Sequence, residues 1–404
     1  MDDDPHRHLE LMTMRTRRQR GLSIIELMIA ITLGLLVLAG LTTVFVTASE
    51  SQRELQRSAQ QIENGRYAMD LLTQDLHHAG FYGRYSAYAD GTTIPDPCLT
   101  GDAAALTTDL AVPVQGFIAA DQSSRPSLTG TTCATYLPSA NLYPGSDILV
   151  IRRAETTPLR YPTDGLTPTV TSADTAMLNE VYLQTDPGTA DIQFGNGAAI
   201  ASDKKANGDA ATIRQKNGNA ESIRKYRVHI YFVAPCSIPA GGSTVCTGSS
   251  DDAGSPLPTL KRLELSASGG TRTFNTVPIA EGVDALKVEY GIDNSPSTAN
   301  ASTQRIGDGA SDLYIPNATA ATLTAVHLTG VVSAKLWLVA RSPQTSPGYK
   351  DTKTYSVATP STVLGAGTVA GTGLTYGPFG DAYKRHAFFS EVRVVNLSSR
   401  RENP

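Results

Sequence analysis

The sequence predicts an α+β protein in which a long N-terminal helix, membrane-spanning in its first half, packs on a loop-rich antiparallel β-sheet head. Three observations support this fold class. An apolar run covers residues 22–46, a helical spacing of apolar residues continues over residues 47–80, and short segments of alternating apolar and polar residues follow up to residue 394. The first pattern is typical of a membrane span, the second of an amphipathic helix and the third of strands.

The composition favours an exported, loop-rich β protein over a cytosolic enzyme. The chain has 404 residues with 34 basic and 38 acidic side chains, which gives a net charge of -4. Charged residues make up only 18% of the chain, while it contains 35 Gly and 23 Pro. A balance this close to neutral argues against a general nucleic-acid-binding surface.

The apolar run is long enough to cross a membrane. From Leu22 to Val46 it is about 25 residues, which as a helix is ~37 Å long at ~1.5 Å per residue. That length exceeds a hydrocarbon core of roughly 30 Å. The basic residues before it are Arg15, Arg17, Arg18 and Arg20. By the positive-inside rule these arginines remain in the cytoplasm, so the chain after Val46 is expected to be exported.

Glu26 is the one formal charge inside the apolar run. A carboxylate near the centre of a membrane helix costs roughly 2.5–3.5 kcal/mol, so it needs a partner. No cation lies one or two turns along the same helix. We therefore expect the partner to come from another chain or from a new terminus. Cleavage after Gly21 would create such a terminus, because Leu22 would carry a free α-amine and Glu26 would become the fifth residue.

This arrangement resembles the class III signal of type IV prepilins. That signal has a basic leader ending in Gly, an apolar first mature residue, a Glu at the fifth mature position and an uninterrupted apolar helix. Gly21, Leu22 and Glu26 hold these places, with Leu22 where Phe is usual. The resemblance implies that prepilin peptidase cuts between Gly21 and Leu22 and methylates the new amine. It also implies that Glu26 pairs with the N-terminal amine of a neighbouring subunit during assembly.

Two simpler interpretations compete with this one. A cleaved secretory signal has a shorter apolar region that ends at a small-residue site. The tripeptide Val46-Thr47-Ala48 has that form, but the run before it is too long and contains Glu26. A plain single-span anchor explains the length and the basic flank, although it gives no reason for Gly21 or Glu26.

The helix is expected to continue beyond the membrane. Its apolar or small positions are Leu55, Ala59, Ile62, Met69, Leu72, Leu76 and Ala79. Their steps of three, four and seven follow one face of a helix, and Gly80 is placed to end it. The predicted organisation is thus a removed leader at 1–21, a transmembrane or filament-core helix at 22–46, an amphipathic continuation at 47–80 and a periplasmic β-rich head at 81–404.

Three further segments resemble PilW-type minor pilins. They are residues 64–83, with Gly-Arg-x-Ala and Ala-Gly-Phe-x-Gly runs, Gly282–Asp293, and Lys384–Asn396. Val395 stands where the family usually has an Arg before the Asn. The resemblance covers both ends of the chain well and its middle poorly. It implies a pilin-like fold, with the second half of the helix packed on the head.

Six strands are expected in the head, and long loops connect them. The predicted strands are 147–153, 226–233, 261–265, 285–290, 332–340 and 389–394. Their period of two with one polar face predicts an antiparallel sheet packed on one side, with the helix as its cover. The predicted loops lie at 86–146, 156–176, 186–222, 237–258, 294–322 and 342–380.

The four cysteines, Cys98, Cys133, Cys236 and Cys246, all follow the membrane segment. An even number in an oxidising compartment predicts disulfides, and four cysteines allow three pairings. Closeness in sequence favours Cys98–Cys133 and Cys236–Cys246. A zinc site is the alternative, but no Cys-x-x-Cys pair or Cys/His ligand spacing supports it.

No motif for catalysis, a cofactor or a metal stands out, so we expect a non-enzymatic protein. The resemblance implies a minor pilin that joins other minor pilins and the major pilin in a priming or tip complex, supporting adhesion and twitching motility. It places the chain first in the inner membrane, as a single span with a cytoplasmic N-terminus, and then in the pilus fibre. Alternatives are a minor pseudopilin of a type II secretion system, a membrane-tethered periplasmic binding protein and an exported enzyme.

Overall fold

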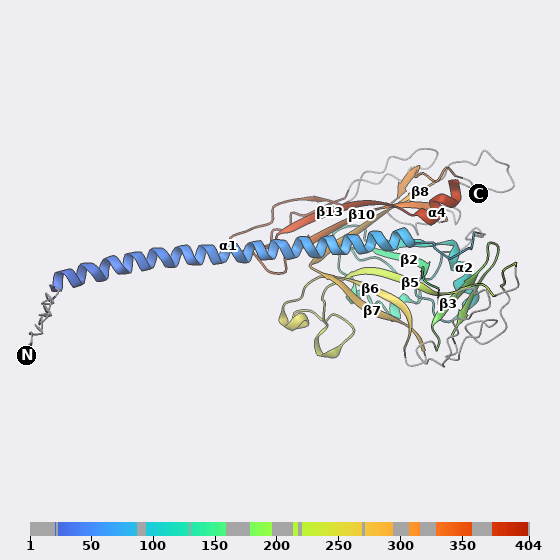
Figure 1. Cartoon of the computed structure of the whole chain (residues 1–404), viewed down its shortest axis with the longest axis horizontal. Helices are drawn as coiled ribbons and strands as arrows, with labels where there is room; N and C mark the ends of the chain where they lie inside the picture. Colours follow the sequence, from blue (N-terminus) through green and yellow to red (C-terminus); the bar gives the residue numbers. More distant parts are fainter. Residues whose placement is uncertain are drawn as a thin grey trace, which may run out of the picture. The chain divides into compact units, whose positions relative to one another are not determined.

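The computed structural model describes most of the chain after the basic leader (Figure 1). The described residues are 21, 23–86, 94–128, 131–158, 178–195, 213–216, 220–268, 271–293, 307–315, 329–357 and 374–402. Two compact units divide the chain, Met1–Gln56 and Arg57–Pro404. Most of the predicted loops 156–176, 186–222 and 294–322 fall outside the described residues.

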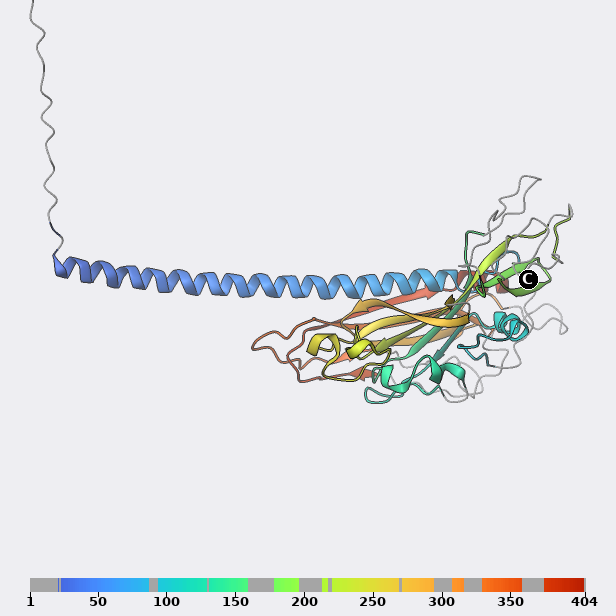
Figure 2. The same cartoon turned by 90° about the horizontal axis from the view of Figure 1, so that it is seen from below.

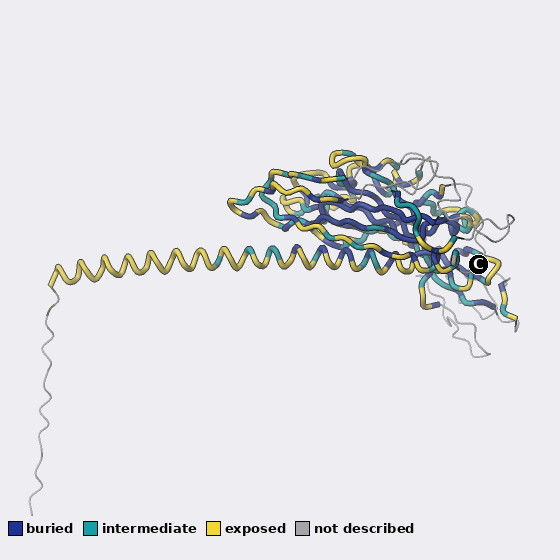
Figure 3. The backbone as a smooth tube through the Cα atoms, turned by 90° about the horizontal axis from the view of Figure 1, so that it is seen from above, coloured by how far each residue is buried: buried dark blue, intermediate teal, exposed yellow. Residues whose placement is uncertain are grey.

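Helix α1, Ile24–His78, confirms the predicted long N-terminal helix. In the first unit its apolar side chains are exposed, as the yellow tube in Figure 3 shows. The hydroxyls of Thr32, Thr42, Thr43 and Thr47 donate hydrogen bonds to carbonyls three or four residues earlier. These polar side chains are therefore satisfied inside the helix, which lowers the cost of an apolar surrounding. By length and composition α1 is able to cross a membrane.

The second unit contains two larger antiparallel sheets and one small ribbon. The first sheet comprises β1 (Val114–Phe117), β2 (Ile148–Ala154), β3 (Val181–Thr185), β4 (Ala190–Phe194), β5 (Ile223–Ala234), β6 (Thr259–Ser268) and β7 (Thr271–Glu281). Its order is β1-β2-β5-β3-β4, and β6 pairs with both β5 and β7. The second sheet has the order β13-β10-β8-β9, with β8 (Val283–Ile292), β9 (Leu313–Ile315), β10 (Val331–Arg341) and β13 (Arg385–Arg393).

Shorter elements complete this unit. They are α2 (Ala103–Thr108), α4 (Val395–Glu402), the two-stranded ribbon of β11 (Tyr355–Ser356) and β12 (Thr375–Tyr376), and the 3₁₀ turns Asp109–Ala111, Thr132–Thr135, Ser139–Asn141, Ala240–Gly242 and Asp251–Gly254. The sequence predicted parts of β2, β5, β6, β8, β10 and β13. It missed β7, although that strand has 11 residues. It also missed α2 and the short strands β1, β3, β4, β9, β11 and β12, because they lie within or next to segments that read as polar loops.

One core cluster joins the C-terminal part of α1 to both large sheets. It contains Ala68, Leu72 and Leu76 of the helix. The same cluster includes Leu149, Ile151 and Tyr231 from the first sheet and Leu286, Val288, Leu336 and Leu338 from the second. In Figure 1 this part of α1 runs between the strands of the two sheets, and Figure 2 shows the strands lying along the helix. The helix thus covers an inner face of each sheet.

The prediction of a sheet packed on one side only is wrong. All ten residues of β8 are buried. A second core cluster, with Leu106 and Cys133, covers the other face of the first sheet. A third, with Trp337, Val339 and Tyr376, covers the outer face of the second sheet. The long connections fold back over these faces. Alternation along the strands therefore marks two buried faces of a sheet, rather than one buried face and one solvent-exposed face.

Candidate functional site

The N-terminus of α1 forms a capping box. The backbone N–H of Ile25 donates to Ser23 Oγ at 3.3 Å, and the N–H of Ser23 donates to Glu26 Oε2 at 3.2 Å. This reciprocal pair satisfies two of the donors that a helix start leaves open. Glu26 therefore has a partner in its own helix, which the sequence argument overlooked. The Ser-x-x-Glu spacing was the signal that could have revealed it.

The processing site lies just before this cap. Gly21 is exposed, and a Cβ placed on it would meet no atom within 4 Å. Leu22 lies outside the described residues, so the expected cleavage and methylation at Gly21 and Leu22 stay predictions. After Glu26 the apolar surface of α1 continues through Leu33 and Leu41, both more than half exposed. A surface of this kind needs lipid or other apolar surfaces to cover it.

Two disulfides fasten the loops of the head. Cys98 pairs with Cys133 across 35 residues, and Cys236 pairs with Cys246 across 10. These are the pairings that closeness in sequence favours. Among the described residues, the two groups with metal-ligand spacing contain these same cysteine pairs. Sulfurs joined in a disulfide carry no thiolate, which is the form of cysteine that binds zinc.

Asp251 shapes the loop beside the second disulfide. Its carboxylate accepts hydrogen bonds from the backbone N–H groups of Ala240, Thr247 and Gly248 at 2.7–2.8 Å and from the Thr247 hydroxyl at 3.0 Å. These donors, chiefly the Gly248 N–H, lower the pKa of Asp251 to about 2. Asp251 thus holds this polar loop in its conformation, a role that the sequence did not predict.

Asp75 fastens the end of α1 to the first sheet. Its carboxylate accepts from Arg153 Nε of β2 at 2.6 Å and from the Tyr231 hydroxyl of β5 at 2.9 Å, and it contacts His229 Nδ1 at 2.6 Å. Burial alone would raise the pKa of Asp75, but the charge and hydrogen bond of His229, together with Arg153, lower it below its ordinary value. Asp75 is therefore held as a carboxylate at neutral pH.

The segments that resemble PilW-type minor pilins meet around α1. Gly65 of the helix lies against the ring of Phe388 in β13, where a Cβ would collide with the ring. Asn396, the last residue of the C-terminal motif, donates from Nδ2 to the carbonyl of Ala79 at 3.1 Å. Gly80 has a φ of +71°, which favours glycine at the end of the helix. These motif residues thus join the end of α1 to β13 and α4.

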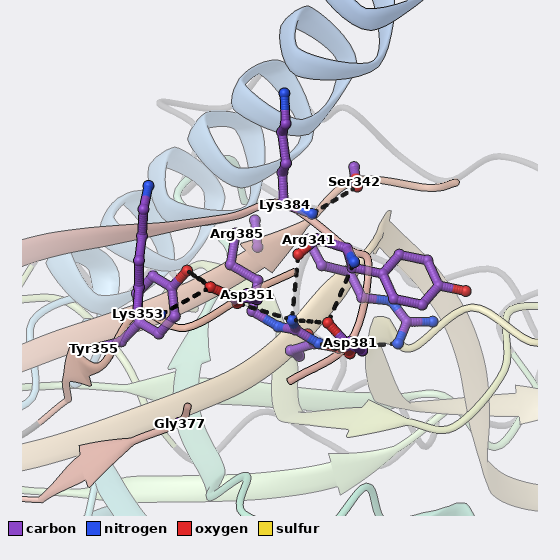
Figure 4. Close-up of polar contacts among 12 residues, drawn as sticks. Arg341, Ser342, Asp351, Lys353, Tyr355, Gly377, Asp381, Lys384 and Arg385 are labelled. Carbon is purple, nitrogen blue, oxygen red and sulfur yellow. Dashed lines mark hydrogen bonds and ion pairs between the residues drawn. The ribbon is translucent and has the colours of Figure 1, made fainter. Parts of the chain in front are cut away.

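Arg385, at the start of β13, is the centre of a buried ionic cluster (Figure 4). It donates from Nε to Asp284 at 2.7 Å, from Nη1 to Asp351 at 3.0 Å, and from Nη1 and Nη2 to Asp381 at 2.6 and 2.7 Å. Burial raises the pKa of Asp284, whereas the hydrogen bonds from Arg385 lower that of Asp381. Because each bond of this cluster is charge-assisted, it holds the loops at this end of the sheet in place.

A cleft of about 390 Å³ borders this cluster. Its walls include Ser58, Gln61 and Ile62 of α1 together with Lys353, Lys384 and His386. In Figure 4 the Lys353 and Lys384 side chains point away from the carboxylates that bind Arg385. The cleft therefore presents basic side chains, while the nearby acids are engaged in the cluster. Sequence reasoning noted the Lys384-Arg385 pair only as a motif and did not anticipate the cleft.

Comparisons with known proteins match both ends of the chain. The model of the prokaryotic N-terminal methylation motif matches residues 16–42, and that of type IV pilus-assembly protein W matches residues 247–396. A solved type IV-like pilin from Thermus thermophilus is similar at 18% identity, covering 42% of this chain and 79% of that one, with a TM-score of 0.17. That score is too low to carry an argument about the fold. No curated protein sequence matches.

The two family matches agree with the geometry. The first match covers the capped start of α1 and its exposed apolar surface, and the second contains β8, β10 and β13. Residues 64–83 lie outside both matches and contribute the helix end that meets Phe388 and Asn396. The chain is PilW-like, similar to the minor pilins of type IV pili in its methylation motif and in the C-terminal part of its head.

Proposed function

We propose that this protein is a minor pilin that prepilin peptidase processes and that takes part in type IV pilus assembly within a priming or tip complex. The observation that carries the proposal is the combination, on one chain, of a methylation motif with an exposed apolar helix and a PilW-like head. An ordinary membrane anchor explains the helix but has no need of the motif.

In this proposal the peptidase removes residues 1–21 and methylates Leu22. The apolar part of α1 holds the mature subunit in the inner membrane, with the head in the periplasm. During assembly Glu26 exchanges its bond to Ser23 for the N-terminal amine of a neighbouring minor or major pilin. A carboxylate in an apolar surrounding gains more from a cation than from a neutral N–H, which favours the exchange. Support of adhesion and twitching motility follows from the assembled fibre.

N-terminal sequencing of the membrane-extracted protein tests the processing step. We expect mature chains that begin with methylated Leu22 in cells that have prepilin peptidase, and unprocessed chains in cells that lack it. A Gly21→Val variant is the matched control and is expected to stay unprocessed in both. An intact peptide that spans Arg20 to Leu22 in peptidase-containing cells contradicts the proposal and leaves a plain anchor.

Deletion of the gene separates the proposed function from a role in type II secretion. We expect the deletion strain to lose surface pili and twitching while it secretes exoproteins normally. Loss of secretion with normal pili assigns the chain to the secretion system instead. Complementation with the full-length chain is the control in both assays.

A further inference from the structure

One edge of the second sheet is open. Strand β13 pairs with β10 along its whole length, from Arg385 opposite Arg341 to Arg393 opposite Ser333, without a register shift. Among the described residues no strand pairs with its other edge. An open edge presents a row of backbone N–H and C=O groups that can extend the sheet with a further strand.

The backbone groups that face outward follow from the ladder. The N–H of Val394 donates to the carbonyl of Val332, and the N–H of Ser342 donates to the carbonyl of Lys384. Because antiparallel pairs alternate between bonded and non-bonded, even-numbered residues of β13 bond to β10. The odd-numbered residues, which include Ala387, Phe389 and Glu391, therefore direct their backbone N–H and C=O groups away from the sheet.

The side chains along this edge are also accessible. Ala387, Phe389 and Glu391 are exposed, and Phe389 keeps 56% of its surface in contact with solvent. Its ring packs against Trp337 of β10, with the ring centroids 5.1 Å apart. An exposed aromatic side chain in the middle of an open edge is an apolar anchor for an added strand.

The basic cleft lies at the N-terminal end of the same edge. Lys384 and His386 line it, and Lys353 stands beside them. At the other end a second cleft, of about 430 Å³, includes Glu391, Arg393 and Tyr314 in its walls. The Tyr314 hydroxyl donates to Glu391 at 2.6 Å. The edge thus presents basic side chains at its start and groups of both signs toward its end.

We propose that the open edge of β13 binds an extended segment of another protein by strand addition, with carboxylates at the C-terminal end of that segment. An added antiparallel strand places its C-terminal end beside the start of β13. There Lys353 and Lys384 favour carboxylates, whereas Glu391 and Arg393 offset each other's charge at the opposite end. This inference goes beyond a role in assembly, because it names a surface of the head and the chemistry of its partner.

Peptide binding to the full chain in detergent tests this proposal. The probe is a fluorescent peptide as long as β13 with alternating Thr and Val and a pair of Asp at its C-terminal end. Its isomer carries the same pair at the N-terminal end. We expect the first peptide to bind about tenfold more tightly than the isomer, because only it places its carboxylates beside Lys353 and Lys384. N-methylation of its edge-facing amides is expected to abolish binding, since it removes the ladder donors.

Two lysine variants locate the contact. Lys353→Glu is expected to weaken binding of the first peptide about tenfold, because a like charge then faces its carboxylates. Lys350→Glu is the matched control, because Lys350 is exposed and does not line the cleft, and it is expected to bind as the parent does. Equal binding of the two isomers, equal effects of the two variants, or no binding at all overturns the proposal.

Hydrogen exchange excludes other occupants of the edge. In the free protein we expect the amides of Ala387, Phe389 and Glu391 to exchange rapidly, and to become protected when the peptide binds. Protection in the free monomer means that the chain covers its own edge, and protection that rises with protein concentration means that a second copy does. Either result overturns the proposal. None of these measurements depends on processing or pilus formation, so failure here leaves the proposed function in place.

Discussion

Gly65 of α1 and Phe388 of β13 pack against each other so closely that no side chain fits between them. A Cβ added at Gly65 would collide with the Phe388 ring. The two residues are far apart in sequence and lie in two segments that resemble PilW-type minor pilins. Their contact brings the helix against the second sheet.

Gly65→Ala is expected to destabilise the head. Overpacking typically costs about 1–3 kcal/mol, and the better helix propensity of Ala offsets about 1 kcal/mol of that. Urea unfolding of the full chain in detergent measures the net loss. Shortening the opposing ring by Phe388→Leu is expected to make Gly65→Ala less costly. Arg66→Ala, at an exposed position of the same helix, is the control. A Gly65→Ala variant as stable as the control contradicts the close packing.

Asp75→Asn is expected to cost about 3 kcal/mol at pH 7, because it removes the charge that faces Arg153 and His229 inside the protein. The pKa of Asp75 is lowered in the folded state, so its stabilising contribution is present above the unfolded pKa of about 4. That contribution is lost as the pH falls through the lowered folded pKa. Unfolding free energies of parent and variant should therefore converge with acidification.

Asp70→Asn is the matched control for Asp75, because Asp70 is an exposed acid on the same helix. We expect its unfolding free energy to stay within about 0.5 kcal/mol of the parent at every pH. A difference between parent and Asp75→Asn that is independent of pH would show that the ion pair is not the source of the stability.

Lys287→Met is expected to destabilise the contact between the sheets. Lys287 Nζ of β8 lies 2.5 Å from Asp147 Oδ1, just before β2, and both side chains are buried. Without the lysine, Asp147 keeps an uncompensated charge, which typically costs about 3–5 kcal/mol. The double variant Lys287→Met with Asp147→Asn is expected to recover much of that loss. Additive losses from the two changes argue against the pair.

The pH dependence of this pair has the opposite sign to that of Asp75. Burial raises the pKa of Asp147 to about 6 in the folded state, above the unfolded value. Its contribution to stability is thus fully present below about pH 4 and is lost as the pH rises to about 6. Asp147→Asn should remove this part of the slope, which urea unfolding at several pH values measures.

Ser23→Ala and Glu26→Gln separate the cap from the assembly role of Glu26. Removing the Ser23 side chain takes away a cap worth about 1 kcal/mol but leaves the carboxylate. Glu26→Gln keeps a hydrogen-bond acceptor and removes the charge. We expect Ser23→Ala cells to make pili and Glu26→Gln cells to make few or none, by electron microscopy. Both variants should be processed at Gly21, and equal loss of pili would indicate that Glu26 acts as a cap alone.

The two disulfides are expected to stabilise the head unequally. The chain-entropy argument gives about 4 kcal/mol for the 35-residue separation of Cys98–Cys133 and about 3 kcal/mol for the 10-residue separation of Cys236–Cys246. Replacing each pair by Ser and measuring urea unfolding tests the order. The parent after reduction serves as the control, because it should match the variant that lacks both pairs. The reverse order would indicate that native contacts, rather than loop closure, determine the cost.

Local spacing in the sequence encodes much of the secondary structure. The apolar run, the helical steps of Leu72 and Leu76, and the alternation in β8 and β10 depend on neighbours a few residues away, so they predict α1 and the main strands. The resemblance of Gly21, Leu22 and Glu26 to the prepilin signal predicted a pilin-like protein. The alternating pattern placed polar residues such as Lys287 on a solvent-exposed face, because alternation does not reveal what covers the second face of a sheet.

Contacts between groups that are distant in sequence depend on the packed fold. Asp75 and His229, or Arg385 and Asp284, are more than a hundred residues apart in sequence, and each pair forms only because the helix and both sheets pack together. The open edge of β13 likewise follows from strand order. Each charged group and each strand edge has many possible partners far away in the sequence. Burial of the shared core brings only one set of these partners into contact.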